Sequence, residues 1–183
     1  MNPLKSSIRT GLLGGILCLA ALGTSCKNDD IPSESYYTFT GQTVRDYLNT
    51  EENYSIYNEF LNRSNETAES DGLNVPSLLS AYGYYTVFAP TNEAMTQYLE
   101  EAFSCSSLDE LYETLGTHSA DSVVTLVTRM HIISSGNNAT IYESQNFQQK
   151  LPDRNLYDKM MYITTLGDTY LVNDSSMIVQ RDV

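Results

Sequence analysis

The segment over residues 84–103 constrains the fold most strongly, because a strand, a stop and a helix follow one another without a spacer. Tyr84–Phe88 is aromatic and β-branched, which favours a strand. Pro90 ends that strand, and Thr91 or Asn92 can then cap a helix. One face of this helix is apolar at intervals of four residues: Met95, Leu99 and Phe103. The sequence therefore predicts a strand that leads directly into an amphipathic helix.

Hydrophobic spacing and turn residues predict the other elements. Helices are expected over residues 43–49, 53–63, 77–82, 108–115 and 121–132. Strands are expected over residues 160–166, 169–172 and 176–183. The polar stretch 64–72 is expected to be a loop. Helices that come first and strands that come mostly later indicate an α+β fold.

Two of these helices carry more specific predictions. Ser107 and Glu110 have the spacing of a capping box at the start of the helix over residues 108–115. The helix over residues 121–132 is expected to turn Val123, Val127 and Met130 inward.

The N-terminus has the pattern of a secretory signal peptide over residues 1–25. Lys5 and Arg9 precede a charge-free run from Thr10 to Ser25. This apolar run is shorter than the roughly 20 residues that a membrane-spanning helix needs. A basic start, a short apolar core and small residues at the end are typical of a cleaved leader.

The end of the leader, Leu22-Gly23-Thr24-Ser25-Cys26, resembles a lipobox, where bacterial signal peptidase II cuts before a lipidated cysteine. Gly23 stands where that pattern prefers leucine. The resemblance implies acylation of Cys26 and a membrane anchor; the alternative is ordinary cleavage near Gly23 or Ser25 with release of a soluble protein.

The residues after Cys26, Lys27-Asn28-Asp29-Asp30, look like the acidic signal by which some Gram-negative bacteria export lipoproteins to the outer face of the outer membrane. The alternative is a solvated linker start, because residues 26–41 form a polar stretch with Pro32 and several serines. The first interpretation predicts a protein anchored by lipid in the bacterial outer membrane and exposed at the cell surface.

The cysteine count agrees with a lipid anchor. The chain has three cysteines, of which Cys18 lies in the leader and Cys26 at the cleavage site. Cys105 is then left alone, so no internal disulfide is expected. We expect Cys105 to be half-buried and inert, with a reactive thiol as the alternative. No Cys-x-x-Cys motif or Cys/His cluster indicates a metal site.

The charge of the exported part excludes one class of partner. The chain has a formal net charge of −13, and its two basic residues before Thr10 leave eight basic against 23 acidic residues downstream. A domain this acidic repels the phosphate backbone of nucleic acids. Nucleic-acid binding is therefore not expected. The simpler interpretation is that the charge keeps the domain soluble.

Residues 85–95, YTVFAPTNEAM, closely resemble the first motif of fasciclin (FAS1) domains. Residues 130–133, MHII, match the segment where the family usually has Tyr-His, and residues 172–183, VNDSSMIVQRDV, look like the strand pair before its last motif. The resemblance implies a fasciclin-like domain over residues 42–183, with helices packed on a small, mostly antiparallel sheet or wedge. The family's final strand is not found before Val183, so either the domain is truncated or the sequence is a fragment. A missing strand would leave an exposed edge and an incomplete core.

Two histidines are the candidate chemical groups of the domain. His131 is expected to be a core histidine or, alternatively, a ligand contact together with Met130, which replaces the family's tyrosine. His118 lies near Ser119 and Asp121, but the sequence offers no nucleophile elbow or oxyanion element. No catalytic residue, cofactor or metal is therefore expected, and the protein is not expected to be an enzyme.

Two functions remain open at this point. The first is adhesion or binding of a protein or glycan at the cell surface by a lipid-anchored fasciclin domain. The second is an accessory lipoprotein of a nutrient-uptake system, which would hold a small ligand in an apolar pocket of the same fold.

Overall fold

The structure is a computed structural model, and it describes residues 41–67, 72–135 and 140–183. Residues Gly41–Val183 form one compact unit. The predicted signal peptide, Cys26 and the linker up to residue 40 lie outside the described residues. In the part that is described, no helix combines the length and the apolar character that crossing a bilayer requires.

The N-terminal helices are α1 (Val44–Thr50), the 3-10 turn η2 (Glu52–Tyr54), α2 (Ser55–Thr67) and α3 (Val75–Ser80). Helix α1 begins with a capping box, in which the Thr43 hydroxyl accepts from the Asp46 amide and the Asp46 carboxylate accepts from the Thr43 amide. These bonds satisfy amides that a helix start leaves free, so α1 has a fixed N-terminus.

The next helices are α4 (Asn92–Phe103), α5 (Leu108–Leu115) and α6 (Thr117–Met130). Thr91 caps α4 through the Ala94 amide, and the Ser107 hydroxyl caps α5 through the Glu110 amide. The predicted capping box at Ser107 is only half formed, because the Glu110 carboxylate accepts from the amide and hydroxyl of Ser106 instead.

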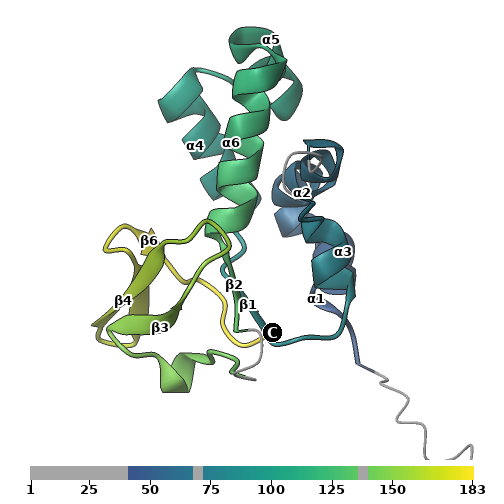
Figure 1. The fold of residues 1–183 in the computed structure, drawn as a ribbon. Helices are drawn as coiled ribbons and strands as arrows, with labels where there is room; N and C mark the ends of the chain where they lie inside the picture. The colour runs from purple at the N-terminus through teal and green to yellow at the C-terminus, as the bar shows by residue number, and fades with distance from the viewer. Residues whose placement is uncertain (1–40, 68–71, 136–139) are drawn as a thin grey trace, which may run out of the picture. The chain divides into compact units, whose positions relative to one another are not determined.

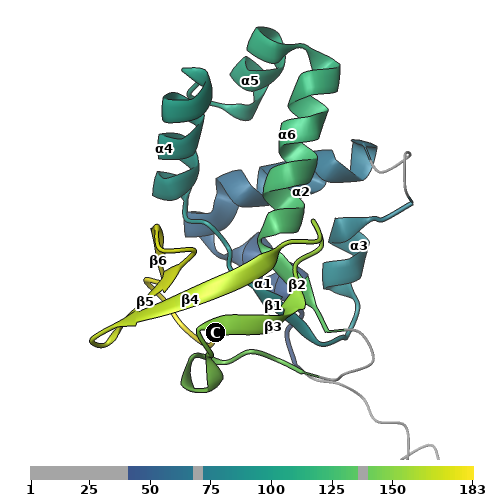
Figure 2. The same ribbon diagram turned by 60° about the vertical axis from the view of Figure 1, so that its left-hand side comes forward.

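The strands form two antiparallel sheets, which lie beside each other in Figures 1 and 2. The first pairs β1 (Tyr85–Val87) with β2 (Ile132–Ser134). The second has the order β3 (Lys150–Arg154), β4 (Met160–Leu166), β5 (Thr169–Val172) and β6 (Ser176–Met177). A single bridge between Ile133 and Asn155 joins the sheets. Gly167, with a φ of 62°, allows the tight turn between β4 and β5.

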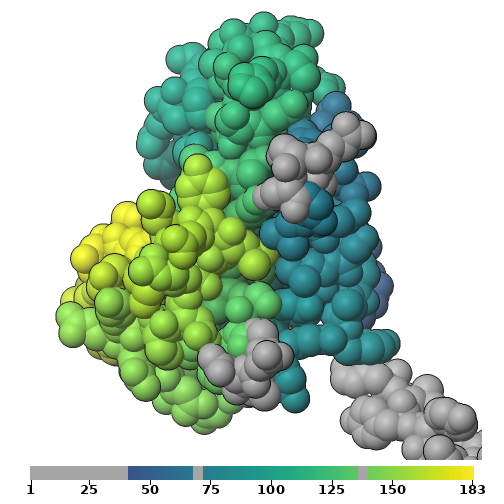
Figure 3. All heavy atoms as spheres, in the orientation of Figure 1, coloured from purple at the N-terminus to yellow at the C-terminus, as the bar shows by residue number. Residues whose placement is uncertain are grey.

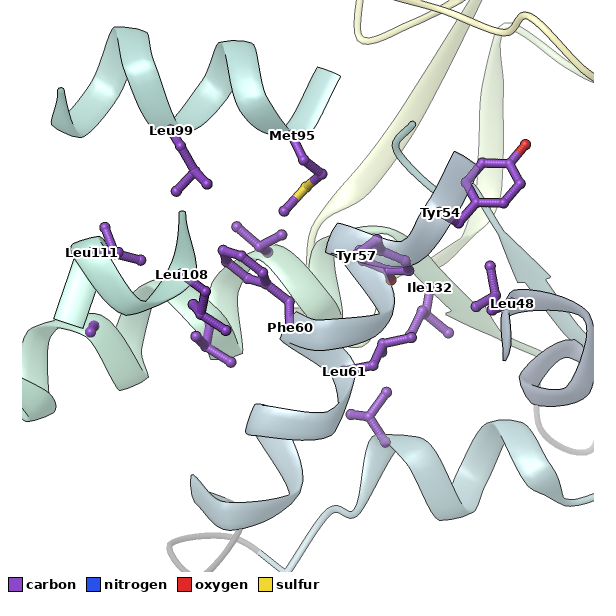
Figure 4. Close-up of a cluster of buried hydrophobic side chains, with 14 of the residues drawn as sticks. Leu48, Tyr54, Tyr57, Phe60, Leu61, Met95, Leu99, Leu108, Leu111 and Ile132 are labelled. Atoms are coloured by element: carbon purple, nitrogen blue, oxygen red, sulfur yellow. The ribbon is translucent and has the colours of Figure 1, made fainter. Parts of the chain in front are cut away.

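The larger hydrophobic core lies among the helices (Figure 4). Tyr57, Phe60 and Leu61 of α2 are fully buried there. Met95 and Leu99 of α4 point toward Phe60 in the same view. The stripe predicted on α4 is therefore its buried face, although Phe103 is only half-buried.

The smaller core lies under the four-stranded sheet. Alternate residues of β4, Met161 and Ile163, are buried together with Leu151 of β3 and Val172 of β5. In the space-filling view, the side chains of the sheet (yellow-green) lie at the left and those of α2 and α3 (blue) at the right (Figure 3). Strand β2 contributes Ile132 to the larger core and Ile133 to the smaller one, and Phe88, just after β1, also packs on the smaller core. The paired strands β1 and β2 therefore connect the helical part to the sheet.

The predicted α+β, fasciclin-like fold is confirmed, with four local corrections. Helix α2 runs to Thr67, into the stretch expected to be a loop. Helix α6 spans 117–130 rather than 121–132, because Ile132 pairs with β1. Its buried residues include Ala120, Val124 and Val127, whereas Val123 and Met130 are only half-buried. The expected strand over 176–183 is limited to Ser176–Met177.

Candidate binding groove

A groove with a volume of about 860 Å³ lies beside strand β1. Strand β1 and the turn after it, residues 85–91, form one wall. Other walls come from α1, the start of α4, the end of α6, residues 141–144 and the C-terminal tail, residues 178–183. This volume is in the upper part of the range of natural ligand sites.

The strand–proline–helix motif fixes the wall that β1 forms. Thr91 caps its own helix, while Asn92 reaches back to the start of α2. The Asn92 Oδ1 accepts from the Ile56 amide at 2.9 Å, and its Nδ2 donates to the Glu52 carbonyl at 2.9 Å. Thr91 and Asn92 were both predicted as caps, and they cap different helices: Thr91 caps α4 and Asn92 caps α2. This arrangement ties β1 and α4 to the N-terminal helices.

Three side chains satisfy the carbonyls that the end of α6 leaves free. The ring Nδ1 of His131 lies 2.7 Å from the Val127 carbonyl. The Tyr57 hydroxyl donates to the Thr128 carbonyl at 3.2 Å. The Met130 carbonyl accepts a hydrogen bond from Asn155, which lies on the sheet side. Because a helix has unpaired carbonyls in its last turn, these contacts fix where α6 stops and where the groove begins.

Asn155 is the contact from the sheet side. It is 4% exposed, and its Nδ2 donates to the Met130 carbonyl at 2.8 Å. Its Oδ1 accepts from the amides of Tyr157 and Lys159 at 3.1 and 2.9 Å. One side chain thus closes the turn between β3 and β4 and holds it against the end of α6.

The protonation state of His131 follows from its surroundings. A carbonyl can only accept, so Nδ1 carries the proton that is donated to Val127. Burial lowers the pKa of His131, although the hydrogen bond to Val127 acts in the opposite direction. The ring is therefore neutral near pH 7, and its Nε2 is an acceptor. The ring of Tyr57 packs edge-on against it, at 5.8 Å between centroids.

The C-terminal tail, residues 178–183, also lines the groove. The Tyr54 hydroxyl donates to the Gln180 Oε1 at 3.3 Å. The Asp182 carboxylate accepts from the hydroxyl and, at 2.8 Å, from the amide of Ser144; these bonds lower the pKa of Asp182. Arg181 lies over the ring of Tyr170, 5.5 Å from its centroid. These contacts hold the tail against the rest of the domain.

Most of the groove lining is apolar or uncharged. Among its described residues, the charged ones are Glu143, Arg181 and Asp182, all on the side of the tail. β1, the start of α4 and the end of α6 offer Val87, Met95 and Met130 to the groove, with His131 as a hydrogen-bond acceptor. Such a surface suits an uncharged ligand with a few hydrogen-bonding groups.

The structure brings the two predicted binding residues together. Met130 and His131 both line the groove and are half-buried. Their role in binding stays a prediction. His131 has features of both predicted roles, a core histidine and a ligand contact. Its Nδ1 bonds to the Val127 carbonyl within the domain, while its ring lines the groove.

The other candidate residues lie apart from the groove. His118 and Ser119 are exposed in the first turn of α6, and the Asp121 carboxylate accepts from the Tyr112 hydroxyl at 2.6 Å. Cys105 is fully buried rather than half-buried, with only 1% exposure. No cluster of three or more His, Cys, Asp or Glu side chains in the described ranges is placed to hold a metal ion.

The sequence did not indicate that the tail lines this groove, nor that Asn155 fixes the end of α6 beside it. An asparagine with Asp158 three residues later can signal a turn. Nothing in its local sequence points to α6, because that contact spans 25 residues.

A family model for the fasciclin domain matches residues 57–183, which is more than half of the chain. The chain belongs to the fasciclin domain family. The match includes β1, the end of α6 and the tail, and thus most of the groove lining of this fasciclin domain. A search of the curated proteins gives no match.

Proposed function

We propose that this fasciclin domain is the binding module of an exported lipoprotein, and that it binds a protein or glycan at the cell surface through the groove. The groove carries this proposal, since it is concave, mostly uncharged and built from the family motif. Fasciclin domains are commonly linked to adhesion and binding. The excess of acidic residues argues against nucleic acid as the ligand.

We propose further that Cys26 carries the lipid anchor. The lipobox-like end of the leader and the acidic residues 29–30 support an outer-membrane location with the domain facing outward. Multiple acyl chains would anchor the protein stably, because each buried methylene adds about 0.8 kcal/mol.

Labelling cells with a palmitate analogue tests the anchor. We expect the label on the wild-type protein and its loss in Cys26→Ala, with Cys105→Ala as the matched control that keeps the label. Equal labelling of the wild type and Cys26→Ala would contradict lipidation at Cys26. Protease treatment of intact cells then tests display, and a protein that stays uncleaved until the cells are lysed would contradict outward exposure.

The second candidate function is that of an accessory lipoprotein in nutrient uptake. The volume of the groove favours it, because about 860 Å³ can enclose a small organic molecule. Thermal-shift screening with small nutrients distinguishes the two functions, since a ligand that binds the native state raises its melting temperature. A stabilising small molecule whose effect is lost in Met130→Ala would favour uptake over adhesion.

A further inference from the structure

Arg45 of α1 is a buried cation without an ion pair. The residue is 9% exposed, and an arginine is rarely buried to this extent unless an acidic group pairs with it. Within the described ranges, no carboxylate forms an ion pair with its guanidinium. Burial lowers the pKa of Arg45, but arginine stays protonated near pH 7 because its usual pKa is far above neutral. The domain therefore holds a positive charge that no adjacent negative charge compensates, which is costly.

Neutral side-chain amides surround this guanidinium. Its Nη1 donates to the Oδ1 of Asn58, and its Nη2 donates to the Oδ1 of Asn62, one turn further along α2. Asn58 in turn donates from its Nδ2 to the Oδ1 of Asn49 at 3.0 Å. These four residues, Arg45, Asn49, Asn58 and Asn62, are named the Arg45 patch, and their hydrogen bonds join α1 to α2.

The free hydrogen-bonding groups of the Arg45 patch are mostly donors. A guanidinium has five N–H donors, of which the two bonds to asparagine use two. The amide nitrogens of Asn49 and Asn62 have no acceptor within the described ranges. Asn49 and Asn62 are exposed, so a ligand can reach them from the solvent. A negatively charged group that accepts hydrogen bonds fits this surface best.

We propose that the Arg45 patch binds a sugar that carries a carboxylate, such as a hexuronate residue of an acidic glycan. Carboxylates often accept two parallel hydrogen bonds from arginine, which suits the N–H donors left on Arg45. Sugar hydroxyls both donate and accept, as do the amides of Asn49 and Asn62. None of the four patch residues lines the groove, so this is a second site that goes beyond the proposed function.

The charge of the domain favours a ligand with a single negative charge. The part of the chain after the leader has 23 acidic against eight basic residues. Its field repels a phosphate with two charges more strongly than one carboxylate. An acidic side chain of a peptide supplies the same carboxylate, but it has no hydroxyls for the asparagine amides. Both are therefore expected to bind more weakly than the sugar acid.

The test is NMR spectroscopy of the isotope-labelled full chain, in which the Nε–H signal of Arg45 is followed during titration with methyl glucuronide. We expect this signal to shift until the site is saturated. Methyl glucoside has a hydroxymethyl group in place of the carboxylate, and we expect it to leave the signal unchanged at the same concentration. The Nε–H signal of Arg63 is the internal control, because that guanidinium already pairs with Glu66 and Asp109. It should not shift.

One variant supplies the missing negative charge from within the chain. Asn62→Asp places a carboxylate at a position to which Arg45 already donates. We expect it to raise the melting temperature and to weaken the binding of methyl glucuronide about tenfold, because the two carboxylates compete for one guanidinium. Asn65→Asp is the matched control, since it adds the same charge to α2 at an exposed position whose side chain contacts Asn74 instead. Its affinity should stay within about threefold of the wild type.

A second variant separates the charge from the forked donors. Arg45→Lys keeps the positive charge but cannot donate two parallel bonds, so we expect about tenfold weaker binding of methyl glucuronide. Arg63→Lys is its matched control, and we expect it to leave the affinity unchanged.

Each contrary outcome has a distinct meaning. A shift of the Arg45 signal by methyl glucoside equal to that by methyl glucuronide would show that the carboxylate is not recognised, which overturns the proposal. If acetylglutamate methylamide or inorganic phosphate saturates the signal at a lower concentration than methyl glucuronide, the patch binds an acidic peptide or a phosphate, and the sugar acid is overturned. Unchanged affinity in Asn62→Asp, or no shift with any of these probes, overturns the site itself.

Discussion

Replacing Asn155 with alanine should destabilise the fold more than any other exchange of a single polar side chain near the groove. The structure gives this side chain three backbone partners: the Met130 carbonyl, the Tyr157 amide and the Lys159 amide. Alanine removes all three hydrogen bonds at a site that is 4% exposed. The Met130 carbonyl, at the end of α6, would then lose the hydrogen bond that it accepts from the sheet side.

The magnitude follows from these three bonds. A hydrogen bond contributes about 1 kcal/mol net, and a buried group left unpaired costs about 1–3 kcal/mol. Water can reach part of the turn, because Lys159 is exposed. We therefore expect Asn155→Ala to lower the free energy of unfolding by about 2–4 kcal/mol.

Urea unfolding followed by circular dichroism measures this difference. Asn146→Ala is the matched control, because Asn146 is exposed and its side chain has no hydrogen bond within the described ranges; we expect a change within about 0.5 kcal/mol. A loss below about 1 kcal/mol for Asn155→Ala, with an unchanged slope in urea, would refute the view that this side chain fixes the end of α6.

Two further predictions concern the end of α6. Tyr57→Phe removes the hydroxyl that donates to the Thr128 carbonyl, so the free energy of unfolding should fall by about 1 kcal/mol in the same urea assay; no change would show that this carbonyl finds another partner. His131 has a pKa below its usual 6.5, so the unfolded state binds the proton first as the pH falls, and the stabilisation present above about pH 6.5 is lost on the way down to the folded pKa. Unfolding at a series of pH values should show this slope in the wild type and a smaller one in His131→Asn, whose side chain does not titrate; equal slopes would assign the pH dependence to other groups.

Much of the fold follows from local sequence. The β1–α4 segment was predictable because proline, a capping threonine and an apolar repeat act within a few residues of one another. The hairpin of β4 and β5 was predictable for the same reason, since the residues of both strands and Gly167 adjoin in sequence. Both segments are local, so no distant partner decides them.

Two strands were missed because their partners are distant. The Ile132–Ser134 strand continues the apolar pattern of α6, and only its pairing with β1 makes it a strand. Strand β3 contains Pro152 and three charged residues beside its one buried leucine. This pattern argues against a strand unless the strand lies at a sheet edge, as β3 does in the four-stranded sheet.

The candidate site was predictable only in part. The resemblance to the family led to His131 and Met130, and both border the groove. The wall formed by the tail could not be predicted, because it depends on contacts such as Tyr54 with Gln180, which are 126 residues apart.

The most direct test of the groove as the binding site is photo-crosslinking on intact cells. A photoreactive amino acid at Met130 lies in the groove, whereas one at Leu166, 68% exposed at the β4–β5 turn, lies outside its lining. The account predicts that ligand is captured from position 130 and not from position 166. Capture from position 166 alone, or equally from both positions, would contradict it.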